Sequence, residues 1–450
     1  MFLRVHFVRL KMKRTIDLIL LGGGLLLCLH THAEGVSVST ENAQSTATLS
    51  QLEELRDDYD RRLSRLEKRL KQTQAATRIK RANNFNPAMS LILTGGYASY
   101  KNNSTGYHLP GFLLSDEAGL DTEGFSLGES EITLGANVDQ NFYGQATFSF
   151  SDDQGVTSVS TEEAFLESLA LSHGLKLKVG RFFSEMGYIN GKHTHAWDFS
   201  DAPLVYRALF GDQLKQDGLQ LSWLLPLDRY VLMGIETGNG VQYPSAGSHS
   251  GIGDGVLFAK TGGDIGLSHS WQLGVSHWYA NNIKNRASQG VNTVLFNGDS
   301  RIDALNLVYK WAPDGNPVRN NFKFQWEYFK RHEAGLLSTA NTNQNSNYTG
   351  VQSGWYTQAV YQFVPQWSMG FRYDRLNADN KGNNAGFLSQ VDLINSSNTP
   401  QRSSLMLNWQ ASEFSHIRLQ YNDDRSTDNN DKQWLIKYTI VMGAHGAHTY

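Results

Sequence analysis

The stretches Trp355-Tyr356-Thr357-Gln358-Ala359-Val360-Tyr361-Gln362-Phe363 and Trp367-Ser368-Met369-Gly370-Phe371-Arg372-Tyr373 decide the fold. Each alternates apolar or aromatic residues with polar ones, and Val364-Pro365-Gln366 separates the two. Period-two alternation interrupted by a short turn predicts a β-hairpin. Aromatic residues end the apolar faces, as they do where the strands of a membrane barrel meet the lipid headgroups.

Similar hairpins recur from about residue 88 to residue 450, and the chain holds sixteen strand-like segments. A soluble β-sandwich also alternates, but it rarely needs so many strands with long loops on one side. We therefore predict an all-β fold, a sixteen-stranded antiparallel transmembrane β-barrel over 88–450, with long loops outside the cell and both barrel ends in the periplasm. The predicted long loops are 101–124, 184–217, 239–253, 283–300, 333–352 and 376–400.

The residues before the barrel are predicted to serve export and association. Residues 1–33 resemble a signal peptide, with a basic region, a short apolar run and a small-residue cleavage pattern ending at Ala33. A lipoprotein signal at Cys28 is the alternative. Residues 34–49 form a linker, and 50–75 form a helix whose apolar residues recur every three or four positions, as in a periplasmic coiled coil or a single solvated helix. Residues 76–87 lead into the barrel.

Charge and cysteine content exclude several classes of function. Cys28 is the only cysteine, so the chain without its signal peptide can form neither disulfides nor thiolate sites. Removing residues 1–33 takes away five basic residues and one acid, which leaves 35 basic residues against 42 acidic ones. A nucleic-acid partner is therefore not expected. No catalytic constellation stands out, so we predict neither an enzyme nor a cofactor, although the many Ser, His and Asp residues in the loops leave an outer-membrane enzyme open.

Three segments resemble the phosphate-selective porin O/P-like family of outer-membrane porins. They are Glu163–Leu166 with Leu175–Phe183, then Phe324–Tyr328, then Gly354–Tyr361 with Gly370–Asp374. Members of that family form sixteen-stranded trimeric channels, some with an N-terminal periplasmic coiled coil. The resemblance therefore implies a homotrimer. The segment 184–217 has no obvious counterpart in the phosphate-specific members.

Strand parity predicts which charged side chains face the lumen, because a charge facing mid-bilayer lipid costs about 2–4 kcal/mol. Inward acids by the same parity include Glu129, Glu131, Glu163 and Glu167, so bases and acids nearly balance. Two alternatives stay open: a basic lining that attracts anions, or paired charges that stiffen the wall. The candidate pore-lining residues are Lys176, Lys178, Lys310, Lys323, Glu327, Arg372, Asp374 and Arg418, with Lys437 in the same parity class.

The loop 184–217 mixes aromatic and charged residues, unlike a free solvated loop. By likeness to general porins, whose third loop folds into the barrel, it is the candidate constriction. Its candidate selectivity residues are Lys192, His193, His195, Asp198, Asp201 and Arg207. His193 and His195 are also weak metal candidates, as are His445 and His448, but no further ligand has a fixed spacing, so no metal site is predicted.

The predicted function is a porin in the outer membrane of a Gram-negative bacterium. It would pass small hydrophilic solutes or ions by diffusion through a loop-constricted pore, with the lipid bilayer and lipopolysaccharide around it. The alternative is an outer-membrane receptor or uptake channel for a metal ion or metal chelate. Such receptors use about 22 strands and a plugged lumen, and this chain offers a coiled coil in place of a plug.

Overall fold

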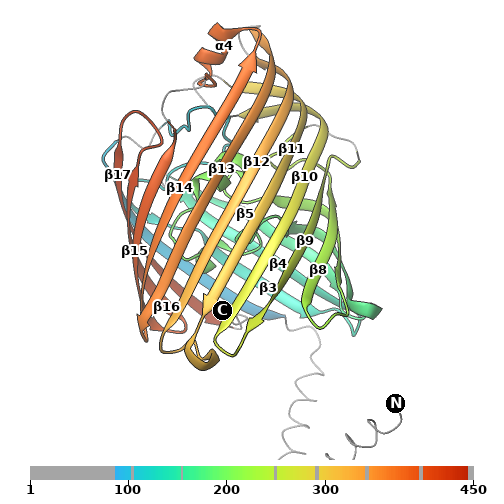
Figure 1. The fold of residues 1–450 in the computed structure, drawn as a ribbon, viewed down its shortest axis with the longest axis vertical. Coiled ribbons are helices and arrows are strands. Elements are labelled where there is room, and N and C mark those ends of the chain that lie inside the picture. Colours follow the sequence, from blue (N-terminus) through green and yellow to red (C-terminus); the bar gives the residue numbers. More distant parts are fainter. Residues whose placement is uncertain are drawn as a thin grey trace, which may run out of the picture. The chain divides into compact units, whose positions relative to one another are not determined.

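The computed structural model describes residues 87–443, with gaps at 103–105, 154–155, 248–250, 289–292, 340–343 and 395–398. The described strands form one antiparallel sheet that closes on itself where β1 (Ala88–Tyr100) pairs with β17 (Asp431–Gly443) (Figure 1). The predicted signal peptide, first linker and coiled-coil helix lie outside the described residues, and so do His445 and His448.

The predicted sixteen-stranded barrel is confirmed. β2 (Gly124–Leu127) and β3 (Ser130–Asn137) follow one another along β1, so they make one of the sixteen barrel strands. The other strands are β4 (Phe142–Asp153), β5 (Val156–Ser168), β6 (Leu175–Phe183), β7 (Lys215–Leu224), β8 (Tyr230–Gly238), β9 (Asp254–Ile265), β10 (His269–Ser288), β11 (Val294–Trp311), β12 (Asn321–Thr339), β13 (Asn345–Val364), β14 (Trp367–Gly382), β15 (Gln401–Ser412) and β16 (Ser415–Asp424).

Helices are few and short among the described residues. They are η2 (Ser172–Gly174), η3 (Thr194–Ala196), α3 (Leu204–Phe210), η4 (Pro313–Gly315) and α4 (Ala385–Gln390). In this part of the chain, no helix has both the length and the apolar character needed to cross a membrane.

The hairpin of β13 and β14 forms as the alternation predicts. Its turn is shorter than expected, because Val364 already pairs with Trp367 and only Pro365 and Gln366 lie between the strands. Gln366 takes a positive φ of 75°, which a tight turn requires. Trp367 is exposed on the outer face, whereas Arg372 is buried on the inner one. Outward apolar and inward polar residues therefore alternate along the hairpin, as a lipid-facing barrel wall requires.

Two of the predicted long loops are wrong. Most of 283–300 and 333–352 is strand, because β10 runs to Ser288, β11 begins at Val294, β12 runs to Thr339 and β13 begins at Asn345. These extensions are rich in Asn, Ser and Thr, so their sequence does not show apolar alternation. The strand pairing continues there all the same, since the backbone ladder does not depend on side-chain polarity.

The main hydrophobic core lies inside the barrel toward the long-loop end. It combines inward side chains of the extended strands, such as Phe296 and Tyr348, with Leu109 from the chain between β1 and β2. Phe387 of α4, at the top of Figure 1, joins the same cluster. Connections at this end of the barrel therefore pack against inward side chains of its wall.

Candidate functional site

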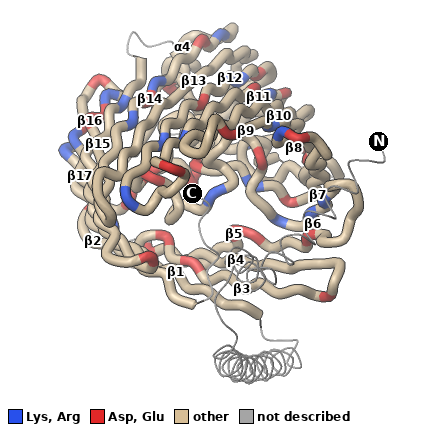
Figure 2. Tube along the Cα trace, turned by 60° about the horizontal axis from the view of Figure 1, so that its bottom comes forward, with Lys and Arg blue, Asp and Glu red and all other residues tan. Residues whose placement is uncertain are grey.

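Residues 184–214, between β6 and β7, run through the inside of the barrel, and we call them the inserted segment. Their side chains bond to wall residues on β3, β5, β12 and β14–β16, which lie on different sides of the ring (Figure 2). Every residue of α3, which belongs to this segment, is buried. The segment is three residues shorter than the predicted loop 184–217, because Lys215, Gln216 and Asp217 belong to β7.

Two histidines attach the beginning of the inserted segment to the wall. The two ring nitrogens of His193 lie 3.0 Å from carboxylate oxygens of Glu131 and Glu163. His195 Nδ1 lies 3.0 Å from Glu131, and the Thr194 hydroxyl donates to Glu129 at 2.9 Å. We call this group the histidine anchor. Burial alone would lower the pKa of His193, but its hydrogen bonds to Glu131 and Glu163 raise it well above the ordinary value, so the ring carries a proton at neutral pH.

Two β-bulges lie beside the carboxylates of the histidine anchor. Ile92 pairs with Glu131 and Gly95 with Leu127, so two residues of β1 face three residues at the break between β2 and β3. The second bulge is in β5. Thr147 of β4 pairs with Glu163, and the next residue, Phe148, pairs with Thr161, so Glu162 is left without a partner position. A bulge changes the direction of the side chains that follow it. In β5 both Glu162 and Glu163 are therefore buried, although plain alternation would turn only one of them inward.

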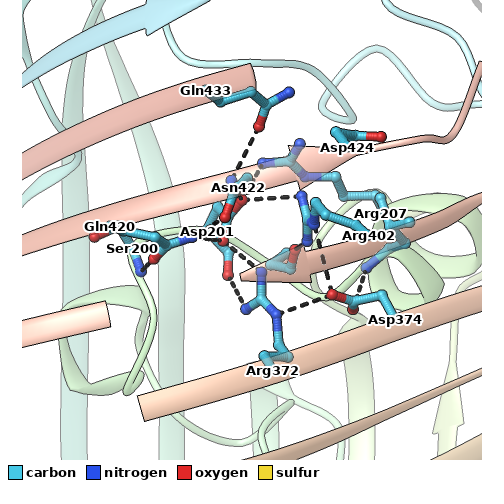
Figure 3. A network of polar contacts seen from close by, with 12 residues as sticks. Ser200, Asp201, Arg207, Arg372, Asp374, Arg402, Gln420, Asn422, Asp424 and Gln433 are labelled. Carbon is cyan, nitrogen blue, oxygen red and sulfur yellow. Dashed lines mark hydrogen bonds and ion pairs between the residues drawn. The ribbon is translucent and has the colours of Figure 1, made fainter. Parts of the chain in front are cut away.

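Arginines attach the later part of the inserted segment to the opposite wall (Figure 3). The Asp201 carboxylate lies 2.5 Å from Arg372 and 2.9 Å from Arg402. Gln420 and Asn422 donate to the same carboxylate at 2.7 and 3.1 Å. We call this group the arginine anchor. Burial alone would raise the pKa of Asp201, but the Arg402 and Arg372 guanidiniums hold it well below its ordinary value.

The arginines also bind the backbone of the inserted segment. Arg372 donates to the Asp201 carbonyl at 2.8 Å, and Arg402 donates to the Ala202 carbonyl at 2.7 Å. Asp374 accepts the Leu204 N–H at 3.0 Å, at the start of α3. Two guanidiniums and a carboxylate thus bond to main-chain atoms. These contacts fix the path of the backbone through the lumen in addition to the side chain of Asp201.

Glu327 holds the inserted segment in the middle. It accepts the Tyr188 N–H at 2.8 Å, the Tyr206 hydroxyl at 3.0 Å and the Tyr356 hydroxyl at 2.5 Å. Asp198, also in the inserted segment, pairs with Lys323 of β12 at 2.6 Å. The pore-lining candidates Glu327 and Lys323 thus bind the inserted segment and leave little of themselves to solvent.

The structure brings some predicted site residues together and keeps others apart. Arg372, Asp374, Asp201 and Arg207 meet around the arginine anchor, with Arg207 3.9 Å from Asp201. Lys176 and Lys178 instead lie 2.8 and 3.9 Å from Glu167, in a separate cluster on the wall of β5 and β6.

The ring nitrogens of the metal candidates are turned to carboxylates. His193 and His195 both contact Glu131. Over residues 87–443, apart from the gaps, no group of three or more His, Cys, Asp or Glu residues has the arrangement of a metal site. The two histidines therefore act in this structure as hydrogen-bonding contacts between the inserted segment and the wall.

The pore-lining residues predicted from the sequence do not include Arg402, because the outward apolar residues of its strand begin only at Leu405. β15 begins at Gln401, and Arg402 lies in phase with the inward Ser404 and Met406. Extending the alternation by one more pair would have found it. Glu162 was missed for a different reason, since nothing in the sequence marks a bulge at that position.

A cavity of about 530 Å³ lies beside the inserted segment, bordered by β1, the β2–β3 break, β16 and β17. We call it the large cavity. His195 of the histidine anchor and Asp201 of the arginine anchor both line it. A second cavity of about 240 Å³ is lined by Tyr188, Lys192, Lys310 and β10 residues, and we call it the small cavity. The two share no lining residue, so the inserted segment has a separate space on each side.

A curated relative shows the family of the chain. An uncharacterized protein of Aquifex aeolicus (strain VF5) is 30% identical over 347 residues, which cover 73% of this chain and 70% of that protein. The chain belongs to this Aquifex protein's family. No family model matches the chain. The resemblance of this chain to the phosphate-selective porin O/P-like family therefore stays a prediction.

Solved structures with a similar barrel are more distant. A loop L8 deletion mutant of OmpT, an outer membrane protein of Vibrio cholerae, is 11% identical with a TM-score of 0.49, covering 79% of this chain and 99% of that chain. OprB of Pseudomonas putida is 12% identical with a TM-score of 0.47, covering 82% and 97%. An anion-selective porin from Comamonas acidovorans is 8% identical with a TM-score of 0.45, covering 79% and 99%. The fold of the present chain is established by its own strand pairing.

Proposed function

We propose that the chain is an outer-membrane porin through which small hydrophilic solutes or ions diffuse passively. One observation carries this proposal: the closed barrel encloses a polar cavity of about 530 Å³ beside an inserted segment that is fixed by buried charges. An apolar outer wall places such a barrel in a membrane, and a polar interior supplies the water-filled path that solutes need.

The inserted segment would set the width of the path. It is held at the wall of β3 and β5 by His193 and at the wall of β14 and β15 by Asp201. Because ion pairs attach the segment to two walls, it can stay in place without a covalent link. Solutes would pass beside it through the large cavity, and no bond is made or broken.

Further parts of the proposal rest on the sequence. The chain would be kin to the phosphate-selective porin O/P-like family and, by that resemblance, would form a homotrimer in contact with lipopolysaccharide. Residues 1–33 would be removed on export, and residues 50–75 would form the periplasmic coiled coil. Gel filtration with light scattering of the detergent-solubilised chain would measure the number of copies, and a monomer would contradict the trimer.

Planar lipid bilayers test the channel function directly. Purified full-length chain should insert in discrete steps, each with an ohmic conductance that is proportional to salt concentration. A folded barrel that inserts without conductance would contradict the porin. Saturable binding of a metal chelate by such a closed barrel would favour the receptor that the sequence leaves as the alternative.

A further inference from the structure

We propose that the large cavity is a passage that prefers cations over anions, and that Arg418 limits this preference. The proposal rests on the channel function above and adds the class of solute that the channel favours. It concerns the summed charge of a passage and assigns no fixed cation site.

The lining of the large cavity holds more acids than bases. Its four bases are Arg207, Lys215, Arg418 and Lys437, and its eight acids are Asp116, Glu117, Asp121, Glu129, Asp152, Glu162, Asp201 and Asp212. An opening lined by charge of one sign, with walls of low dielectric constant, raises the local concentration of ions of the other sign. The excess of carboxylates therefore favours cations.

Three of the four bases are already compensated. Lys215 pairs with Glu162 at 2.8 Å, and Lys437 pairs with Asp121 at 3.2 Å. Arg207 lies 3.6 Å from Asp212 and 3.9 Å from Asp201. A base in close contact with a carboxylate contributes little net field at the distance of a passing ion, so these three bases attract anions only weakly.

Three acids of the lining have no basic partner among the described residues. Asp116 belongs to the connection between β1 and β2, Glu129 to the β2–β3 break, and Asp152 to the end of β4. Glu129 accepts a hydrogen bond from the Thr194 hydroxyl. Because the three come from separate elements, the negative potential extends along the passage and is not confined to one point.

Arg418 is the exception among the bases. It is only 8% exposed and lines the large cavity, yet within the described part of the chain its guanidinium makes no ion pair or hydrogen bond. It pairs in register with Lys437 on β17, so its neighbour on that strand is another base. An uncompensated guanidinium at this place repels cations and lowers the preference that the acids create.

The small cavity shows the opposite charge. Lys192 and Lys310 are the charged residues of its lining, which includes no acid among the described residues. The inserted segment thus separates a larger acidic space from a smaller basic one. Cation preference of the whole channel follows if most of the current passes through the larger space.

Reversal potentials in planar bilayers test the proposal on the full-length chain. With a tenfold gradient of KCl, the sign of the reversal potential should show potassium favoured over chloride. The double variant Asp116→Asn with Asp152→Asn should lower the potassium-to-chloride permeability ratio by about twofold or more, and Arg418→Gln should raise it by a similar factor. Lys381→Gln removes an exposed base outside the cavity and should leave the ratio unchanged.

Two results would overturn the inference while leaving the porin intact. One is a conducting wild type that favours chloride or neither ion, and the other is an Arg418→Gln channel with a lower potassium preference. Absence of any conductance would instead contradict the proposed function. The three variants change exposed or cavity-lining residues outside both anchors, and heat-modified mobility on gels would verify that each barrel is folded.

Discussion

The two anchors of the inserted segment use the same interaction with opposite polarity. At the histidine anchor the segment supplies the cation, His193, and the wall supplies the carboxylates of Glu131 and Glu163. At the arginine anchor the segment supplies the carboxylate of Asp201, and the wall supplies Arg372 and Arg402. The inserted segment therefore contributes a cation at the histidine anchor and an anion at the arginine anchor, and each faces its complement.

Apolar packing also holds the inserted segment, since Met186, Trp197 and the apolar side chains of α3 belong to the main hydrophobic core, and the charged anchors add direction to that packing. Exchanging the two ends would bring like charges together at both walls, and like charges in contact are unfavourable. The direction in which the segment crosses the barrel is therefore specified by charge. The anchors differ in depth as well, because the side chains of Arg372 and Arg402 are almost fully buried while that of His193 is one-fifth exposed.

The strongest test of this comparison is Asp201→Asn. The variant keeps the shape of the side chain but leaves the buried guanidiniums of Arg372 and Arg402 to share one carboxylate, Asp374, in place of two. We therefore expect a loss of about 3–5 kcal/mol in the free energy of unfolding. Urea unfolding of the barrel in phospholipid vesicles, followed by tryptophan fluorescence, measures it. A loss below about 1 kcal/mol would mean that the arginines find other partners and that the anchor is not held by charge.

A smaller effect is expected from His193→Ala. Two carboxylates lose a shared donor, but Glu131 keeps its contact with His195, and Glu163 is more exposed than the arginines. About 1–3 kcal/mol should therefore be lost in the same urea experiment. The control Thr194→Val removes the neighbouring hydroxyl and leaves both ion pairs of His193 in place. If the two variants cost the same, packing and not charge would account for the histidine anchor.

The opposite polarity of the anchors predicts opposite pH dependence. The pKa of His193 is raised by its carboxylate partners, so its contribution is present below the unfolded value of about 6.5 and is lost as the pH rises through the higher folded value. The pKa of Asp201 is lowered, so its contribution is present above about 3.9 and is lost as the pH falls toward the lower folded value. Unfolding midpoints measured against pH should show the alkaline loss disappear in His193→Ala and the acid loss shrink in Asp201→Asn. An unchanged alkaline limb in His193→Ala would assign that loss to another group.

The smallest effect should come from an ion pair outside both anchors. Lys381 lies 3.0 Å from Asp379, and its side chain is 73% exposed. Lys381→Gln should change the unfolding free energy by less than about 1 kcal/mol, because exposed pairs are weakened by water and salt. A larger loss would show that burial does not distinguish the anchors from surface pairs in this barrel.

Much of the fold follows from alternation alone. The hairpin of β13 and β14 lies at the twelfth and thirteenth positions of the ring, as its sequence order predicts, and Arg372 faces inward opposite Phe371, which is exposed. Alternation fails where the strands leave the membrane, because water meets both faces and the apolar signal disappears. The extensions around Ser288 and Asn345 were missed for this reason.

The residues of the inserted segment were predicted as a group, but their partners were not. His193 and Asp201 stand out because charged and aromatic residues are unusual together in a loop. Their partners are far away in sequence: 30 residues separate His193 from Glu163, and 171 separate Asp201 from Arg372. Only the curvature of the closed sheet brings these positions together, and one sequence carries no measure of that curvature.

The seam between β1 and β17 has a consequence for the order of assembly. The inserted segment precedes β14, β15 and β16 in the chain, yet it is enclosed by them, and a finished ring offers no gap through which a loop bonded to several strands could be threaded. The segment must therefore reach the interior before the first and last strands meet, and Asp201 remains without its arginines until then. A chain that ends before Asp431 lacks β17 and should leave the segment open to protease, whereas protection in that chain would show that closure is not required.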